Sequence, residues 1–219
     1  MRKAFSYWVR RCAWFTPFRR WMFYRYGYAF TPEQLCYLVA CLTATKEVPG
    51  DVIEVGCAQG HTTVFLKKHL RSSGISKRYL CIDTFCGFRD EDVAWEAYSR
   101  GKDSRLYAGL FANNSIRDFR YTLELNGFGD VICIEADVKE YTFEEPISFC
   151  LLDVDLYKPT LHALRHMWQH LCCGGMIVVD DCTDGNMWDG AYLAYREFTQ
   201  EVNLQPIVVC QKLGVIQKS

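Results

Sequence analysis

Acidic residues end five short apolar segments of this 219-residue sequence. Each segment is rich in Val, Ile, Leu or Cys, which is typical of buried β-strands. In an open sheet of parallel strands, ligands bind at the carboxyl ends of the strands, so the residues that end them are the first candidates for chemistry. Repeated acids at that edge predict a site that handles cations or hydroxyl groups. The acids are Glu54, Asp83, Asp137, Asp153, Asp155, Asp180 and Asp181.

Three of these acids form a candidate metal site, since Asp153, Asp180 and Asp181 come from two neighbouring strand ends. Carboxylate oxygens are hard ligands of the kind that Mg²⁺ prefers, and three of them leave coordination positions open for water and a substrate. A diol bound to such an ion has its hydroxyl acidified and oriented for attack. The sequence therefore predicts Mg²⁺ at this edge of the sheet.

The first strand runs into a turn, EVGCAQG, that contains Gly56 and Gly60. Glycines at these positions allow a tight turn and the close approach of a ligand. The turn lacks the full G-x-G-x-x-G pattern of a dinucleotide phosphate site, and Glu54 suits a positively charged amine better than a pyrophosphate. Asp83 is placed to accept hydrogen bonds from two ribose hydroxyls, and Asp137 to meet an adenine amino group. These residues predict a nucleoside cofactor that carries an amine.

Strand-like and helix-like segments alternate around these residues. A helix begins after Thr31, its N-cap, with Pro32 at the first helical position, and it ends near residue 49. Two closing segments, 206–210 and 213–217, form a hairpin with a two-residue turn. The fold class is α/β, an open, mostly parallel seven-stranded sheet with a C-terminal antiparallel hairpin and a helical N-terminal cap. We expect helices at 62–71, 115–125, 160–171 and 192–202 and parallel strands at 51–56, 78–85, 130–137, 147–155 and 174–181.

The first 30 residues differ in composition from the rest of the chain, with seven basic, 12 aromatic and no acidic residues. Arginines interrupt every apolar run, so neither a signal peptide nor a membrane span is expected. We expect residues 1–30 to form an arm and residues 31–219 a single domain. Packing of the arm on the domain or on a second copy of the chain is favoured over peripheral contact with an anionic membrane.

Charge and cysteine content restrict the partners and the compartment. The 25 Lys and Arg residues balance 26 Asp and Glu, which argues against nucleic acid as a partner. The 12 cysteines include no C-x-x-C pair, and several lie in strand-like runs, so we expect buried, reduced thiols and a cytoplasmic protein.

Several of these stretches resemble the class I S-adenosylmethionine-dependent methyltransferases, and among them the metal-dependent sugar O-methyltransferases of the macrocin and mycinamicin type. The resemblance implies a Rossmann-like fold, S-adenosylmethionine as cofactor, Mg²⁺, and a hydroxyl acceptor on a sugar or glycosylated small molecule. It also implies that Glu54, Gly56 and Gly60 line the methionine end of the cofactor, Asp83 the ribose and Asp137 the adenine, while Asp153, Asp180 and Asp181 bind the metal. The matching stretches span about residues 31–215 and read GDVIEVGCAQG, CIDTFCGF, GLFANNS, LLDVDLYKPTLHAL and GGMIVVDDC.

The general base is open at this point. Related catechol-type enzymes carry a lysine near a D-x-D-K motif, whereas Leu156 follows Asp155 here, so that lysine is not carried over. A base must reach the acceptor hydroxyl. We rank Asp184 first, followed by Asp155, Lys158 and His61.

Other interpretations concern the remaining segments and the function. The charged segment 86–114 is expected to be a lid. His162, His166 and His170 recur every four residues, and we expect them on the solvated side of their helix. A catalytically silent scaffold with the same fold remains an alternative function. An NAD-dependent oxidoreductase is a weaker one, because the glycine turn lacks the phosphate-binding pattern.

Overall fold

The computed structural model describes residues 26–219, together with Val9, Cys12, Thr16 and Pro17. Most of the arm expected over residues 1–30 therefore lies outside the described residues, and its packing, membrane and dimer alternatives stay predictions. Within the part of the chain that is described, no helix is both long and apolar enough to cross a membrane.

One seven-stranded sheet forms the centre of the molecule, with the strand order β3-β2-β1-β4-β5-β7-β6. Strands β1 to β5 pair in parallel, while β7 pairs antiparallel with both β5 and β6. The predicted fold class is thereby confirmed. The strands are β1 (Asp51–Val55), β2 (Tyr79–Asp83), β3 (Ile132–Glu135), β4 (Ile147–Leu152), β5 (Leu171–Val179), β6 (Ile207–Val209) and β7 (Leu213–Gln217).

The central strands are covered on both faces. Every residue of β1 and of β4 is buried. Parallel strands that lie between two layers of helices read as unbroken apolar runs, which is the pattern that predicted them. Edge strand β6, in contrast, exposes Ile207 and Val208.

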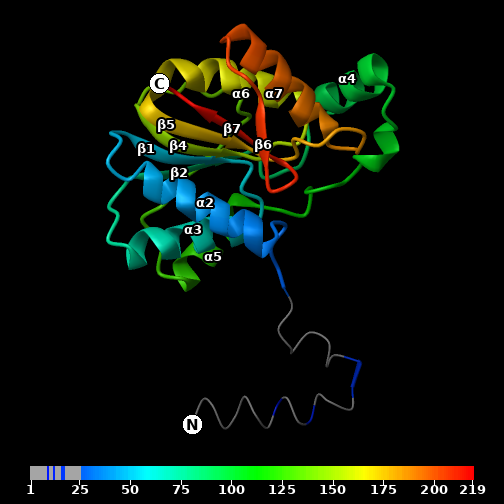
Figure 1. Ribbon diagram of the computed structural model, residues 1–219. Helices are drawn as coiled ribbons and strands as arrows, with labels where there is room; N and C mark the ends of the chain where they lie inside the picture. The colour runs from blue at the N-terminus through cyan, green and yellow to red at the C-terminus, as the bar shows by residue number, and fades with distance from the viewer. Residues whose placement is uncertain (1–8, 10–11, 13–15, 18–25) are drawn as a thin grey trace.

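Helices form a layer on each side of the sheet (Figure 1). Helices α2 (Pro32–Ala44), α3 (His61–Ser72) and α5 (Ile116–Leu125) cover one face, and α6 (Tyr157–His170) and α7 (Asp189–Glu201) cover the other. Neighbouring strand residues enter opposite cores, because side chains alternate along a strand.

Helix α2 begins where the sequence predicted, whereas the helical cap expected from the arm lies mostly outside the described residues. The hydroxyl of Thr31 accepts a hydrogen bond from the backbone N–H of Gln34, and the Gln34 side chain accepts one from the Thr31 N–H at 2.8 Å. This reciprocal pair satisfies two N–H groups that the helix leaves free at its start.

Segment 86–114 contains a helix that the sequence analysis did not predict, α4 (Asp90–Arg100), followed by the 3₁₀ turn η2 (Ser104–Leu106). An ion pair attaches α4 to the start of α7, since the Arg100 guanidinium lies 2.6 Å from Asp189 Oδ1. Within α4, the same guanidinium lies 2.5 Å from Glu96 Oε2. Glu96 Oε1 also accepts the backbone N–H of Tyr157, at the start of α6. The segment is therefore anchored over the ends of two helices, and its function as a lid stays a prediction.

Several sequence-based boundaries are wrong. Helix α2 ends at Ala44 rather than near residue 49, and α6 and α7 each begin three residues before their predicted starts. Strand β5 starts directly after α6, three residues earlier than predicted, and β3 is shorter than the predicted segment at 130–137. The hairpin connection has three residues, because Cys210 and Gln211 adopt left-handed φ angles of 48° and 71° before Lys212. Of the histidines expected to be solvated, His166 is exposed, but His162 is half-buried with its Nε2 unpartnered among the described residues.

Candidate functional site

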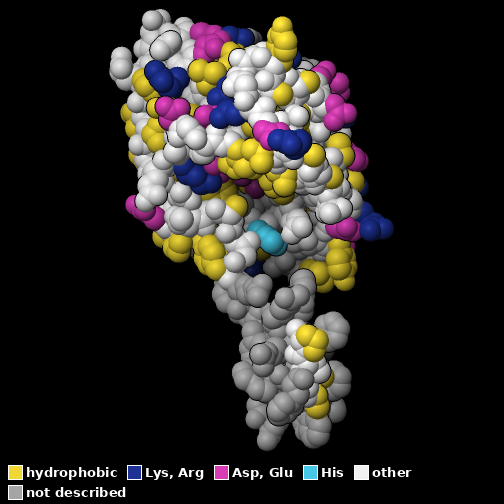
Figure 2. Space-filling view, turned by 90° about the vertical axis from the view of Figure 1, so that its right-hand side faces the viewer, with side chains coloured by type: hydrophobic (Ala, Val, Ile, Leu, Met, Phe, Trp, Pro, Cys, Tyr) yellow, Lys and Arg dark blue, Asp and Glu magenta, His cyan; other side chains and the backbone are white. Residues whose placement is uncertain are grey.

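A pocket of about 670 Å³ opens at the carboxyl ends of the five parallel strands, β1 to β5. Figure 2 faces the side of the molecule that carries α4 and shows this face hollowed between hydrophobic and charged side chains. Gly60 and Asp184 are not among the residues that line the pocket. The predicted site residues that do line it are Glu54, Gly56, Asp83, Asp137, Asp153, Asp155, Asp180 and Asp181.

Both predicted glycines are required by the backbone of the turn after β1. Gly56 has a φ of 81°, and a Cβ there would lie 1.8 Å from the carbonyl oxygen of Asp153. Gly60 has a φ of 82°, and its Cβ would lie 2.9 Å from the ring of Phe119. Gly56 therefore brings the turn against the end of β4, whereas Gly60 allows the turn to pack on α5.

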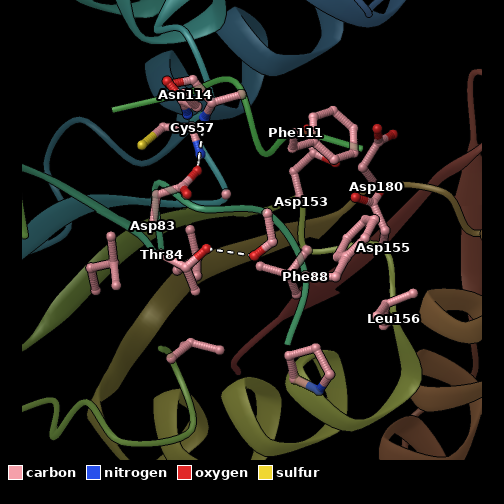
Figure 3. Close-up of a pocket in the computed structure, with 18 of the residues that line it drawn as sticks. Cys57, Asp83, Thr84, Phe88, Phe111, Asn114, Asp153, Asp155, Leu156 and Asp180 are labelled. Atoms are coloured by element: carbon pink, nitrogen blue, oxygen red, sulfur yellow. Dashed lines mark hydrogen bonds between the residues drawn. The ribbon is translucent and has the colours of Figure 1, made fainter. Parts of the chain in front are cut away.

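Asp83 ties the glycine turn to the loop after β2. Its Oδ2 accepts the backbone N–H groups of Cys57 and Ala58 at 2.9 and 2.8 Å, and its Oδ1 accepts that of Phe85 at 2.7 Å. Figure 3 shows this carboxylate directed at the turn. Each carboxylate oxygen has two lone pairs, so Asp83 keeps the capacity to accept a ribose hydroxyl.

Glu54 turns its carboxyl group into the core beneath α3. The hydroxyl of Tyr79 donates to Glu54 Oε2 at 2.7 Å, Thr63 lies beside the same carboxyl group, and the residue is only 1% exposed. Burial disfavours the charged form and raises the pKa of Glu54 to about 7. Its predicted contact with a cofactor amine stays a prediction.

Asp137, at the end of β3, lies in a network of charges. Its Oδ2 is 3.3 Å from Arg89 Nε and 3.6 Å from Lys139 Nζ, and its Oδ1 accepts the Lys139 N–H. Lys139 also pairs with Glu91 and Asp92 of α4. An ammonium group thus lies among these three acids, and the network joins the predicted adenine side of the pocket to α4.

Four carboxylates meet on the opposite side of the pocket, and we call them the carboxylate cluster: Asp153, Asp155, Asp180 and Asp181. Oxygens of Asp153, Asp155 and Asp181 lie within 4.8 Å of one another. Asp155 and Asp181 have left-handed φ angles of 62° and 57°, a conformation that costs energy outside glycine and often marks functional sites.

Burial and charge repulsion disfavour the ionised forms of two members of this cluster, Asp153 and Asp155. Burial, followed by repulsion from the neighbouring carboxylates, raises the pKa of Asp153 and of Asp155 well above the ordinary range. After burial, the nearby carboxylate of Asp181 is the largest cause of the raised pKa of Asp155.

Asp180 has a partner that the sequence analysis missed. Its Oδ2 lies 2.7 Å from the ammonium group of Lys212, which is also 3.3 Å from Asp181 Oδ1. Asp180 Oδ1 is buried and has no hydrogen-bond partner among the described residues. Burial raises the pKa of Asp180 to about 6, although Lys212 opposes the shift. The structure therefore brings Asp155 into close contact with Asp153 and Asp181, while Asp180 keeps one oxygen free.

These residues fit a hard divalent cation. An orphaned buried oxygen and several convergent carboxylates leave negative charge that the protein compensates with one lysine, and an oxygen-only donor set suits Mg²⁺.

The four candidate general bases lie in different parts of the structure, and two of them are in the pocket. Asp155 and His61 line the pocket, whereas Asp184 is exposed on the loop after β5 and Lys158 lies over the ring of Trp95. Only the first two are therefore placed to meet a ligand in the pocket.

Three aromatic side chains form a wall beside the carboxylate cluster, which we call the aromatic wall: Phe88, Phe111 and Trp188. The ring centroid of Phe88 lies 5.4 Å from that of Phe111 and 5.8 Å from that of Trp188. All three line the pocket, and Figure 3 shows Phe88 and Phe111 next to Asp153 and Asp155. The sequence analysis missed them because they come from separate loops with no shared periodicity.

Known proteins with similar sequence or structure are methyltransferases. A curated relative from Streptomyces olivaceus, 8-demethyl-8-(2,3-dimethoxy-alpha-L-rhamnosyl)-tetracenomycin-C 4'-O-methyltransferase, is 28% identical over 157 residues. The match covers 68% of this chain and 59% of that protein. The O-methyltransferase NovP superposes with a TM-score of 0.73 at 19% identity, and the calicheamicin methyltransferase CalS11 with 0.69 at 20%. Each comparison covers 85% of this chain and 80% of the other.

A family model extends these likenesses over nearly the whole described chain. The macrocin-O-methyltransferase model matches residues 32–218, which include every strand of the sheet and every residue of the carboxylate cluster. The family resemblance stated from the sequence motifs is confirmed, and this chain belongs to the macrocin-O-methyltransferase (TylF) family.

Proposed function

We propose that this protein transfers a methyl group from S-adenosylmethionine to a hydroxyl of a sugar, with Mg²⁺ bound at the carboxylate cluster. One observation supports this most directly. The glycine turn and Asp83 share a pocket with the cluster, and Gly56 is packed against the backbone of Asp153. A methyl donor held by the turn and a hydroxyl held at the cluster would therefore be neighbours, and such placement supplies much of the rate of a group transfer.

Residues on one side of the pocket bind the cofactor, and residues on the other side bind the cation. The turn around Gly56 and the carboxylate of Asp83 bind the methionine and ribose parts of the cofactor. Asp153 and Asp181, whose oxygens converge, would hold the cation together with the unpartnered Oδ1 of Asp180. Mg²⁺ supplies Lewis acidity, which lowers the pKa of a bound hydroxyl.

Asp155 is the base in this proposal, in place of the exposed Asp184. It lines the pocket beside Asp181, and burial together with the surrounding carboxylates raises its pKa, so its ionised form takes up a proton readily. The acceptor proton moves to a carboxylate oxygen of Asp155 as the hydroxyl oxygen bonds to the methyl group, while the methyl–sulfur bond of the cofactor breaks and S-adenosylhomocysteine leaves.

The aromatic wall is the proposed binding surface for the acceptor sugar. Aromatic rings pack well against the C–H face of a sugar ring, and the wall stands next to the cluster that would orient the hydroxyls. The relative from S. olivaceus and CalS11 carry rhamnosyl acceptors in their descriptions, the latter as a TDP-rhamnose 3'-O-methyltransferase, so rhamnosides are the first probes.

Two experiments test the proposal. Calorimetric titration of S-adenosylhomocysteine in the presence of Mg²⁺, with NADH as the comparison ligand, is expected to show binding of the former alone. Methyl transfer to TDP-rhamnose and simple rhamnosides is then assayed with Mg²⁺ and with EDTA. Cofactor binding without transfer to any sugar would favour the silent scaffold, and transfer in EDTA would refute the metal.

The aromatic wall has its own test. With a rhamnosyl acceptor that is turned over, Trp188→Ala is expected to raise KM about tenfold while Trp188→Phe, which keeps a ring, stays close to wild type. Affinity for S-adenosylhomocysteine should be the same in all three proteins. Equal KM values would show that the acceptor does not lie on this wall.

A further inference from the structure

Lys212 is a cation placed inside an acidic site. It lies in the three-residue connection between β6 and β7, and its side chain is 22% exposed. Its ammonium group is 2.7 Å from Asp180 Oδ2 and 3.3 Å from Asp181 Oδ1. Among the described residues, Asp180 and Asp181 form no salt bridge with any other positively charged side chain.

The surrounding structure holds Lys212 in this position. The backbone oxygen of Lys212 accepts the N–H of Cys182, next to the paired acids, at 2.7 Å. The preceding residues are held as well, since Cys210 O accepts a hydrogen bond from the Gln34 side chain of α2 at 3.0 Å. The ring of Phe30 lies 5.0 Å from the Lys212 ammonium group, which adds a cation–π contact.

The charge of Lys212 matters because the cluster is largely shielded from water: Asp180 is buried, and Asp153, Asp155 and Asp181 are half-buried. Asp153, Asp155, Asp180 and Asp181 repel one another, and unpaired buried charges are strongly destabilising. Lys212 pairs with one oxygen of Asp180 and leaves Oδ1 free. The geometry therefore places one positive charge beside the cluster while Asp180 Oδ1 stays unpaired.

We propose that Lys212 is a resident counter-cation, which stabilises the carboxylate cluster when no metal is bound and, by repulsion, weakens the binding of a divalent cation there. The inference rests on the metal site of the proposed function. Lys212 and the metal ion would both interact with the negative charges of Asp180 and Asp181. Without the charge of Lys212, the stability of the folded protein should therefore depend more strongly on the bound metal ion. The residue is a positioning residue for the cluster and takes no part in the transfer itself.

The test compares wild type with Lys212→Met, which keeps the chain length without the charge, and Lys212→Arg, which keeps the charge. Mn²⁺ is titrated by calorimetry at mildly alkaline pH, and thermal unfolding is followed with EDTA and with MgCl₂. Lys67→Met is the matched control, because Lys67 forms a 2.7 Å ion pair with Asp130 away from the pocket.

Lys212→Met is expected to bind Mn²⁺ at least about tenfold more tightly than wild type, because a positive charge beside the ion is gone. Its Tm in EDTA should fall, and MgCl₂ should raise that Tm by more than it raises the Tm of wild type. Lys212→Arg should resemble wild type, and Lys67→Met should lower Tm equally with and without metal.

Two results would overturn the inference, and they separate it from the proposed function. If wild type binds Mn²⁺ and Lys212→Met binds it with equal or lower affinity, the role of Lys212 as a counter-cation is refuted, while the metal site of the proposed function is not. Absence of Mn²⁺ binding in wild type and in Lys212→Met would refute the metal site and the counter-cation together.

Discussion

The two sides of the pocket satisfy their acidic residues in opposite ways (Figure 3). At the ends of β1 and β2, the Asp83 carboxylate accepts three backbone N–H groups and the Glu54 carboxyl group accepts the hydroxyl of Tyr79. At the ends of β4 and β5, oxygens of Asp153, Asp155 and Asp181 lie within 4.8 Å of one another, and Lys212 lies beside Asp180 and Asp181.

The side of the pocket with Asp83 is a preorganised binding surface, whereas the side with the carboxylate cluster holds acidic groups that repel one another. The side with Asp83 is complete without a ligand, because its polar groups already have partners. The side with the cluster contains a buried unpartnered oxygen and two acids with left-handed φ angles, and a bound cation would relieve the repulsion. We therefore expect metal to stabilise the protein more than cofactor does at equal site occupancy.

The largest effect is expected from Asp153→Asn, which removes a charge from the cluster. Methyl transfer should fall by about three orders of magnitude or more, because the hydroxyl is no longer acidified by a bound ion. Affinity for S-adenosylhomocysteine, measured by calorimetry, should change by less than about threefold, since the other side of the pocket keeps its partners. A parallel loss of cofactor binding would contradict the separation of the two sides.

Gly56→Ala should damage both sides at once. The added Cβ would meet the Asp153 carbonyl oxygen at 1.8 Å, so the turn and β4 must move apart. We expect the free energy of unfolding to fall by about 3 kcal/mol or more, as measured by urea denaturation.

Gly74→Ala is the control for Gly56→Ala, because Gly74 also has a positive φ, 66°, but nothing lies within 4 Å of its Cβ position. The left-handed backbone alone costs about 1–2 kcal/mol. Equal losses in the two variants would show that the contact with Asp153 is unimportant.

Asp83→Asn should weaken the cofactor side alone. An amide replaces one acceptor oxygen with a donor and faces backbone N–H groups, so the turn loses part of its support. We expect affinity for S-adenosylhomocysteine to fall by about 30-fold. The rise in Tm caused by MgCl₂ should match that of wild type, and its disappearance would mean that the two sides are coupled.

The smallest effect concerns Glu54 and the pH dependence of stability. Its pKa is raised from 4.5 to about 7 in the folded protein, so the folded state holds a proton that the unfolded state releases between these values. The contribution of Glu54 to stability is therefore highest below pH 4.5 and is lost as the pH rises to 7.

Glu54→Gln removes this titration and retains an acceptor for Tyr79. Between about pH 5 and pH 7 the variant should lose about 1–2 kcal/mol less stability than wild type, in urea denaturation at a series of pH values. Identical profiles would show that Glu54 does not titrate in this range. A large loss of S-adenosylhomocysteine affinity would instead support the predicted contact with the cofactor amine.

Much of the site was predictable because it follows strand ends. Asp83, Asp153 and Asp180 come directly after apolar segments, and parallel strands place their carboxyl ends at one edge of a sheet. Helix α4 was missed because its sequence is charged and its anchors, Asp189 and the N–H of Tyr157, come from other parts of the chain.

The amino-acid sequence by itself determined the order of the strands along the chain, the edge of the sheet that carries the acids and the family. These depend on local periodicity and on short motifs. Only the tertiary structure decided the partners of each side chain: Lys212 meets Asp180 across a hairpin, and Phe88 meets Trp188 across 100 residues of chain. Such contacts arise from the way the layers pack, and no local pattern encodes which side chain will satisfy a buried charge.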